Sequence, residues 1–221
     1  MRLTTGQKLV FIGDSVTDCG RGRPIGEGLG TALGDGYVSL VNGLLEATYP
    51  EAAIRVVNVG SSGNTVRDLA QRWQSDVMAL NPDWLSIMIG INDVWRQFDS
   101  PHQSEIHVLP QEYGRTLLRL CEEVRPTLAG GLILMTPFYI ESLADDAMRQ
   151  RMDEYGAMVR QVAHETEAIF VDTQVAFNAV LEHMHSAAIA WDRVHPNRVG
   201  HTILARAFLN AIEFSWSGET S

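Results

Sequence analysis

Four short segments of this chain contain groups that together could carry out acyl transfer. Ser15 offers a hydroxyl, which becomes a nucleophile when a neighbouring base accepts its proton. His195 is a candidate base, and Asp192, three residues before it, could fix its tautomer and stabilise the imidazolium. The Gly63 backbone N–H and the Asn92 side-chain amide could donate hydrogen bonds to a developing oxyanion. Nucleophile, base, orienting carboxylate and oxyanion donors are the parts that a serine hydrolase requires.

Each segment alone also has an ordinary structural interpretation. A serine at a strand end can cap a helix, and glycine and asparagine are common in turns. The segment around Ser15 is not the Gly-x-Ser-x-Gly elbow of α/β-hydrolases, because position 17 is threonine. The occurrence of all four segments in this order along one chain favours catalysis over four unrelated turns.

The spacing of apolar residues predicts the elements that must position these groups. Short apolar runs, expected to be strands, alternate with longer amphipathic segments, expected to be helices. The expected strands are 8–12, 54–59, 84–89, 131–135 and 168–171, and the expected helices are 37–48, 65–80, 111–124, 145–166, 173–185 and 196–214. We expect Asn64 to cap the second of these helices and Pro196 to lie in the first turn of the last.

This alternation predicts an α/β fold, a doubly wound five-stranded parallel sheet with helices on both faces. Residues 1–221 are expected to form a single domain, because that length suits one sizeable core and no linker or repeat interrupts it. In such sheets, ligands bind outside the carboxyl ends of the strands. Ser15, Gly63 and Asn92 each follow a predicted strand closely, which is the position that this rule requires.

Composition narrows the classes of partner. With 45% hydrophobic and 20% charged residues, the chain has an ordinary globular composition. A formal net charge of −10 argues against a nucleic-acid partner. No apolar stretch is long enough to cross a bilayer, and the first residues do not form a signal peptide. We therefore expect no membrane partner. Two distant cysteines, Cys19 and Cys121, suggest free thiols, which predicts a cytoplasmic protein.

The same segments resemble the conserved blocks of the SGNH (GDSL-like) serine hydrolase family. Gly-Asp-Ser at 13–15, Gly-Ile-Asn-Asp at 90–93 and Asp-x-x-His at 192–195 match three of these blocks, with Val16 where the family usually has leucine. The four residues that name the family map onto Ser15, Gly63, Asn92 and His195. The resemblance implies a flavodoxin-like SGNH hydrolase fold, with the Ser15 N–H as a third oxyanion donor.

Within the family, the chain is similar to bacterial intracellular acetylxylan esterases over segments 11–21, 62–68, 86–97, 134–140 and 190–196. The similarity implies a serine esterase that removes acetyl groups from xylo-oligosaccharides or related sugars through an acyl-serine intermediate. It also implies a homo-oligomer that needs no metal and no organic cofactor. Candidate substrate-binding residues are Asp14, Trp95, Arg96 and Trp191, of which Trp191 is expected to line the acetyl pocket.

Other functions stay open at this point. A lysophospholipase, a thioesterase or a broad-specificity short-chain esterase would use the same scaffold, because leaving-group recognition lies in loops. A carbohydrate- or nucleotide-binding module is the alternative without catalysis. The glycines of Gly20–Gly36 match neither nucleotide-binding glycine motif, so we expect a flexible loop over the site. His183 and His185 point to different sides of a predicted helix, which argues against a metal site.

Overall fold

The computed structural model describes residues 1–216 of the chain, and these residues contain a five-stranded parallel sheet. The strands lie in the order β2-β1-β3-β4-β5. Their bounds are β1 Lys8–Gly13, β2 Arg55–Asn58, β3 Trp84–Met88, β4 Gly131–Met135 and β5 Ile169–Val171. This is the flavodoxin-like strand order, so the predicted α/β fold is confirmed.

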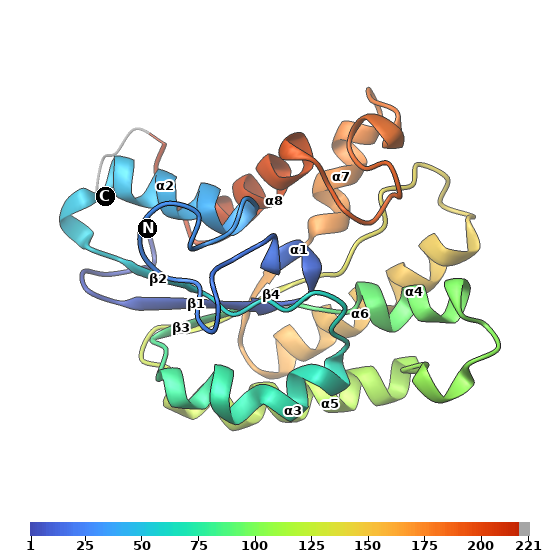
Figure 1. Cartoon of the computed structure of the whole chain (residues 1–221), viewed down its shortest axis with the longest axis horizontal. Helices are drawn as coiled ribbons and strands as arrows, with labels where there is room; N and C mark the ends of the chain where they lie inside the picture. Colours follow the sequence, from blue (N-terminus) through green and yellow to red (C-terminus); the bar gives the residue numbers. More distant parts are fainter. Residues whose placement is uncertain (217–221) are drawn as a thin grey trace.

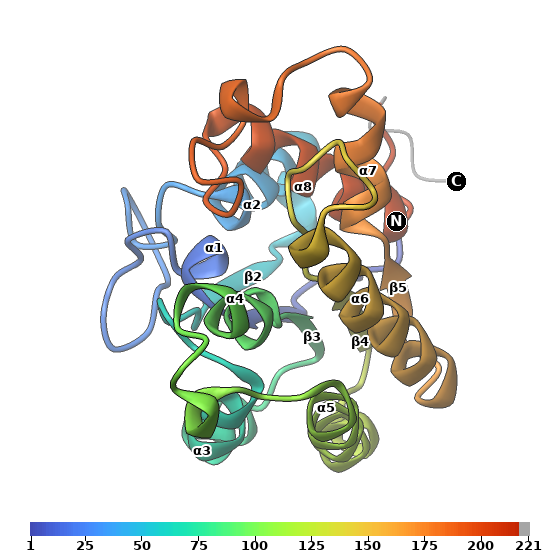
Figure 2. The same cartoon turned by 90° about the vertical axis from the view of Figure 1, so that its right-hand side faces the viewer.

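Helices cover both faces of the sheet (Figure 1, Figure 2). The bounds are α1 Ser15–Asp18, α2 Tyr37–Thr48, α3 Val66–Asp76, α4 Ile91–Asp99, α5 Pro110–Val124, α6 Ala147–Glu165, α7 Thr173–Leu181 and α8 Arg198–Ala211. Short 3-10 turns occupy Pro50–Ala52, Met78–Leu80, Ser104–Ile106, Arg125–Thr127 and Ser186–Ala188. In Figure 1, α2, α7 and α8 lie above the sheet, and α3, α5 and α6 lie below it.

Each helical layer buries its own apolar core against the sheet. Successive side chains of a strand point to opposite faces. In β1, Leu9 and Phe11 therefore join the core beneath α2 and α8, whereas Val10 and Ile12 join the core above α3 and α5. Because both faces are covered, the strands consist of continuous apolar runs, and this is why they could be recognised from the sequence.

The chain changes direction across the sheet at β1. From β1 it crosses to β2 on one side, and it then returns to β3 on the other side of β1. A crevice forms at such a switch point, outside the carboxyl ends of the strands. The residues that follow β1, β2 and β3 consequently meet at one part of the sheet edge, beside α1 and α4.

Several element boundaries differ from those expected. Two helices at this edge, α1 and α4, were not predicted. Ser15 and Asn92 lie in the first turns of these helices and not in open loops. The predicted Asn64 cap is wrong, because the capping box of α3 is formed by Thr65 and Asp68. Similarly, α8 starts at Arg198 with Asn197 as its cap, so Pro196 precedes the helix.

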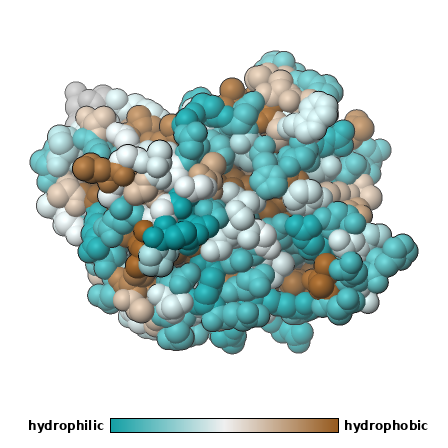
Figure 3. Space-filling model, in the orientation of Figure 1, coloured by the Kyte–Doolittle hydropathy of each residue, from teal (hydrophilic) through white to brown (hydrophobic). Residues whose placement is uncertain are grey.

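The surface is polar over most of the face in Figure 3, and its apolar residues form small, separate groups. No helix within residues 1–216 has the length and apolarity needed to span a membrane.

Candidate active site

The Ser15 hydroxyl is presented by the turn between β1 and α1. The strand ends at Gly13, and Asp14 then caps the short helix by accepting a hydrogen bond from the Val16 N–H at 3.0 Å. Ser15 is the first residue of that helix and is partly exposed. The first N–H groups of a helix have no intrahelical partner, so the Ser15 N–H is available for a ligand.

Ser15, His195 and Asp192 form a continuous hydrogen-bonded chain. The Ser15 Oγ lies 2.8 Å from the His195 Nε2. The His195 Nδ1 lies 2.6 Å from the Asp192 Oδ2, which fits a ring that carries its proton on Nδ1 and accepts from the serine through Nε2. This is the geometry in which a histidine can remove a proton from a serine hydroxyl.

The loop that carries His195 is held in place by the carboxylate of Asp192, which belongs to the same loop. The Asp192 Oδ1 accepts hydrogen bonds from the backbone N–H groups of Val194 at 3.0 Å and His195 at 2.8 Å. Burial of Asp192 disfavours its charge, but the hydrogen bonds from His195 and Val194 outweigh burial and hold its pKa below the ordinary value. The aspartate is therefore ionised at neutral pH, as an orienting group beside an imidazole must be.

Gly63 and Asn92 bring amide hydrogens to the same part of the sheet edge. Gly63 lies in the loop after β2, and Asn92 lies at the second position of α4. The Asn92 Nδ2 donates one hydrogen bond to the Asn64 carbonyl at 3.0 Å, which fixes the plane of the amide. An amide nitrogen carries two hydrogens, so the second N–H can serve an oxyanion.

With this geometry established, comparison with known proteins gives the family. Residues 11–203 match the GDSL-like Lipase/Acylhydrolase family. The chain belongs to that family. The match runs from β1 into α8 and includes Ser15, Asp192 and His195.

Close relatives share nearly the whole of this GDSL-like chain. An acetylxylan esterase from Geobacillus stearothermophilus is 62% identical over 216 residues, which cover 98% of each sequence. The crystal structure of Axe2, an acetylxylan esterase from the same organism, has a TM-score of 0.96 at 61% identity and 98% coverage of both chains. LAE5, an alpha/beta hydrolase from the metagenome of Lake Arreo in Spain, has a TM-score of 0.95 at 53% identity, with 97% of this chain and 98% of that chain covered.

Three further Axe2 structures are catalytic mutants in which a serine, an aspartate or a histidine is replaced by alanine. In Axe2 the mutated aspartate and histidine have the same spacing as Asp192 and His195 in this GDSL-like chain. Other Axe2 structures replace an arginine or a tryptophan.

Two buried carboxylates lie beneath the site of this GDSL-like enzyme. Burial is the main cause that raises the pKa of Asp14 to about 7, against the opposing effects of the Val16 hydrogen bond and His195. Burial likewise raises the pKa of Asp93 to about 7, and the charge of Asp14 adds to this shift. The Asp93 carboxylate accepts the Val66 N–H at 3.0 Å and thereby ties the start of α3 to α4. Carboxylates that are costly to ionise are typical of functional sites.

The predicted substrate-binding residues lie in different environments. Asp14 is buried and caps α1, so it lies beneath the site and not at its surface. The Trp95 ring packs edge-on against His195, with ring centroids 5.8 Å apart. Arg96 stacks on Trp95 and pairs with Asp99, which places it beside the site. Trp191 is 90% exposed, so within this chain it does not enclose an acetyl pocket.

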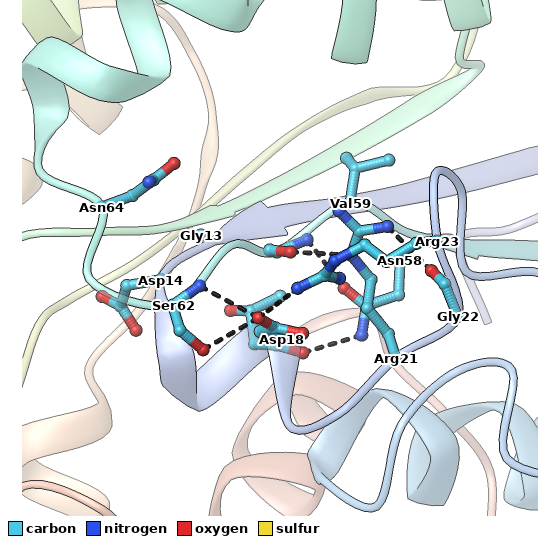
Figure 4. Close-up of polar contacts among 12 residues, drawn as sticks. Gly13, Asp14, Asp18, Arg21, Gly22, Arg23, Asn58, Val59, Ser62 and Asn64 are labelled. Atoms are coloured by element: carbon cyan, nitrogen blue, oxygen red, sulfur yellow. Dashed lines mark hydrogen bonds and ion pairs between the residues drawn. The ribbon is translucent and has the colours of Figure 1, made fainter.

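The glycine-rich stretch Gly20–Gly36 is attached to β2 and the loop that follows it. Gly26 and Asn58 exchange backbone hydrogen bonds at 3.0 and 2.8 Å. The buried guanidinium of Arg21 donates to the carbonyl of Gly22 within its own loop (Figure 4). It also donates to the carbonyls of Gly60 at 2.7 Å and Pro24 at 2.6 Å. These contacts anchor the base of the stretch beside the site.

Residues 1–216 contain no group of three or more His, Cys, Asp or Glu side chains arranged to hold a metal ion. His183 and His185 lie beyond the end of α7, not within it as predicted, and His185 caps the following 3-10 turn. Sequence reasoning missed Asp18 and Arg72, which hold the loop around Gly63. Asp18 contacts Ser62, 44 residues away, and Arg72 contacts the carbonyl of Gly13, 59 residues away, so no local pattern marks these contacts.

Proposed function

We propose that this protein is a serine esterase that removes acetyl groups from acetylated xylo-oligosaccharides. The observation that carries the proposal is the Ser15–His195–Asp192 chain, with Ser15 Oγ to Nε2 at 2.8 Å and Nδ1 to Oδ2 at 2.6 Å. A hydroxyl that is bonded to an imidazole, which is in turn bonded to a carboxylate, is the arrangement that activates serine for attack on an ester.

In the first half of the reaction, His195 accepts the Ser15 proton while the Oγ attacks the acetyl carbonyl. The Ser15 N–H, the Gly63 N–H and the Asn92 side chain donate to the oxyanion of the tetrahedral intermediate. The carbon–oxygen bond to the sugar then breaks, and His195 returns its proton to the sugar oxygen. An acetyl ester of Ser15 and a free sugar hydroxyl result.

In the second half, His195 accepts a proton from water, which attacks the acetyl carbonyl of the intermediate. The same donors hold the second oxyanion, and the bond to Ser15 breaks as His195 gives the proton back to the Oγ. Asp192 stays ionised throughout and stabilises the imidazolium. Acetate leaves, and the site returns to its starting state.

The identity of the substrate is supported by the relatives. The acetylxylan esterase shares 62% of residues over 98% of both chains, and Axe2 has the same backbone at a TM-score of 0.96. Ser15, Asp192 and His195 have the residue types replaced in the Axe2 catalytic mutants, and the aspartate and histidine have the same three-residue spacing. A longer-chain lipase or a thioesterase has no comparable support, although the same fold could carry those activities.

We further propose a cytoplasmic homo-oligomer. Both cysteines, Cys19 and Cys121, are free thiols, which suits a reducing compartment. Trp191 exposes 90% of its surface in the single chain, and large exposed aromatic side chains are common at protein interfaces. Light scattering coupled to size-exclusion chromatography tests the assembly, and a monomer at micromolar concentration would contradict it.

A substrate panel tests the proposed activity. Acetylated xylo-oligosaccharides, 4-nitrophenyl acetate, 4-nitrophenyl octanoate, a lysophospholipid and acetyl-coenzyme A are compared by kcat/KM at one pH. We expect the acetylated sugar to be the best substrate, with acetate as the released acid. A higher kcat/KM for the octanoate, the lysophospholipid or the thioester would contradict the proposal.

A further inference from the structure

The oxyanion donor of Gly63 lies in a loop that has little packing of its own. Gly63 is exposed and has a φ of +82°, in the left-handed region that favours glycine. Apart from Gly63 and its two chain neighbours, no residue has a heavy atom within 4 Å of the position that a Cβ would occupy. An oxyanion donor must be held to within about 0.5 Å of its working position. The residues on either side of Gly63 must therefore be fixed from elsewhere.

The residue before Gly63 is held by Asp18, a buried residue of α1. The Asp18 Oδ2 accepts the Ser62 N–H at 3.0 Å and the Ser62 hydroxyl at 2.8 Å (Figure 4). Arg23 donates to the same oxygen at 2.6 Å. Burial disfavours the Asp18 charge, but the hydrogen bonds from Arg23 and Ser62 outweigh burial and lower its pKa. An ionised side chain three residues after Ser15 thus connects the Gly63 loop directly to the helix of the nucleophile.

The residue after Gly63 is held by Arg72, which belongs to α3. The Arg72 Nε donates to the Asn64 Oδ1 at 2.6 Å. Its two terminal nitrogens donate to the carbonyls of Val59 at 2.6 Å and Gly13 at 3.0 Å. These carbonyls lie at the ends of β2 and β1, so one planar guanidinium joins three segments of the site. The side chain is only 16% exposed.

Close backbone contact limits how far this loop can move. A Cβ at Gly60 would lie 2.4 Å from the Asp18 backbone nitrogen, so the loop backbone touches α1 directly. On the opposite side, the Asn92 amide donates to the Asn64 carbonyl at 3.0 Å. The position of Asn64 therefore affects two of the oxyanion donors, Gly63 as its neighbour and Asn92 through this bond.

We propose that Asp18 and Arg72 are positioning residues, which fix the Gly63 N–H and the Asn92 amide around the carbonyl oxygen that Ser15 attacks. The inference rests on the proposed esterase function and adds to it the residues on which the oxyanion site depends. Neither side chain touches the substrate. Their loss leaves the donors present but displaced, so the effect is smaller than removal of a donor, which costs about 100- to 1000-fold in kcat.

The test compares two arginines of α3. Arg72→Met removes the hydrogen bonds to the loop, and Arg67→Met is the matched control. With its bond to Asp76 at 2.7 Å, Arg72 makes four hydrogen bonds. Arg67 also makes four, two to Glu112 and one each to the carbonyls of Glu105 and His107, and none of these partners belongs to the site. With 4-nitrophenyl acetate, we expect Arg72→Met to lower kcat about 10- to 50-fold with KM within about threefold, because the donors act mainly in the transition state. Arg67→Met keeps the kcat of the wild type.

A second pair of variants keeps the test decisive if Arg72→Met unfolds. Asn64→Ala removes the acceptor of the Arg72 Nε but keeps the backbone carbonyl that Asn92 uses, so it should reproduce the loss in kcat. Asp18→Ala removes the contact with Ser62 and should cause a similar loss. Wild-type kcat in Asn64→Ala, or in folded Arg72→Met, overturns the role of Arg72, and wild-type kcat in folded Asp18→Ala overturns that of Asp18.

A double-mutant cycle separates positioning from general stability. If Arg72 acts through the oxyanion donors, Arg72→Met should lower kcat much less in an Asn92→Ala background than in the wild type. If Arg72 only stabilises the fold, the two losses multiply, and the positioning role is overturned. Ser15→Ala is measured alongside. Full activity in Ser15→Ala refutes the esterase mechanism itself, whereas loss in Ser15→Ala with normal kcat in Arg72→Met refutes only the positioning.

Discussion

The two halves of the carboxyl edge of this sheet differ in how their polar groups are used. After β1, β2 and β3, the hydroxyl of Ser15 is bonded to an imidazole, and amide donors lie at the same part of the edge. After β4 and β5, buried polar side chains such as Thr136, Thr173 and Gln174 are also present, and a cavity of about 310 Å³ opens between α6 and α7. Within residues 1–216, a hydroxyl, an imidazole and a carboxylate form a hydrogen-bonded chain at the first half, and the second half contains no such chain.

The groups of the second half are bonded to one another. The hydroxyls of Thr136 and Thr173 lie 2.9 Å apart, and each also bonds the backbone of the other residue. Gln174 accepts from the Tyr139 N–H at 2.8 Å and donates to the Tyr139 carbonyl at 3.1 Å. Position at a strand end is thus necessary for a site of this fold but not sufficient. Reactivity also requires a base beside the nucleophile and hydrogen-bond donors that are not already bonded to other groups of the protein.

The largest expected effect of a substitution at the first half is that of His195→Ala. Removal of the base should lower kcat at least about 10,000-fold, because the serine hydroxyl is then unable to transfer its proton. Steady-state kinetics with 4-nitrophenyl acetate measures the change. His183→Ala, at an exposed histidine beyond α7, is the control and should keep the kcat of the wild type. A loss of kcat of less than about tenfold in His195→Ala would show that His195 is not the base and that the first half is not the reactive half.

Asn92→Ala should have the next largest effect. Loss of one oxyanion donor is expected to lower kcat about 100- to 1000-fold with little change in KM. Thermal unfolding of the same preparation shows whether the fold is intact. If kcat falls less than about threefold, Asn92 is not part of the oxyanion site.

Asp14→Asn should stabilise the protein at alkaline pH. Burial raises the pKa of Asp14 from 3.8 to about 7, so between these values the folded state binds more protons than the unfolded state. The stability linked to this carboxyl is complete below about pH 4 and is lost as pH rises through 7. Relative to the wild type, the variant should gain about 2 kcal/mol in unfolding free energy between pH 5 and pH 8.

Urea unfolding of both proteins at the two pH values measures this difference. The contributions of titrating groups that do not interact with Asp14 cancel, whereas removal of the Asp14 charge also lowers the pKa of Asp93, so the measured difference includes this coupling. A constant difference between pH 5 and pH 8 would show that the carboxyl beneath the reactive half is not costly to ionise.

Thr173→Val at the second half should leave catalysis almost unchanged. The variant loses a buried hydroxyl and leaves Thr136 partly unpaired, which should lower the unfolding free energy by about 1 to 3 kcal/mol. We expect kcat to stay within about twofold of the wild type. A tenfold loss of kcat without unfolding would show that the second half contributes to the reaction.

Much of the fold could be predicted because both faces of the sheet are buried. The strands are continuous apolar runs, and α2 was predicted with its observed bounds, Tyr37–Thr48. The short helix α4 was missed, although Ile91, Val94, Trp95 and Phe98 have helical spacing. The sequence interpretation considered Asn92 as a turn residue, whereas the structure places the turn at Gly90, with a φ of +128°, and begins α4 directly after it.

The candidate catalytic residues could be predicted from the sequence, but the residues that hold them in position could not. Serine, asparagine and an Asp-x-x-His pair have characteristic types and spacing, and the structure brings Ser15 and His195 within hydrogen-bond distance. The burial of Asp14 and the exposure of Trp191 depend on elements that are distant in sequence. The contacts of Arg72 depend on the backbone carbonyls of three segments, which no sequence pattern marks.

Covalent labelling tests the central claim, that Ser15 is the nucleophile, most directly. The protein is treated with a 4-nitrophenyl phosphonate, and the intact mass and the modified peptide are determined by mass spectrometry. We expect one adduct per chain, on the peptide that contains Ser15, with parallel loss of esterase activity and no adduct in Ser15→Ala. An adduct on another residue, or full esterase activity after complete modification of Ser15, would contradict the account.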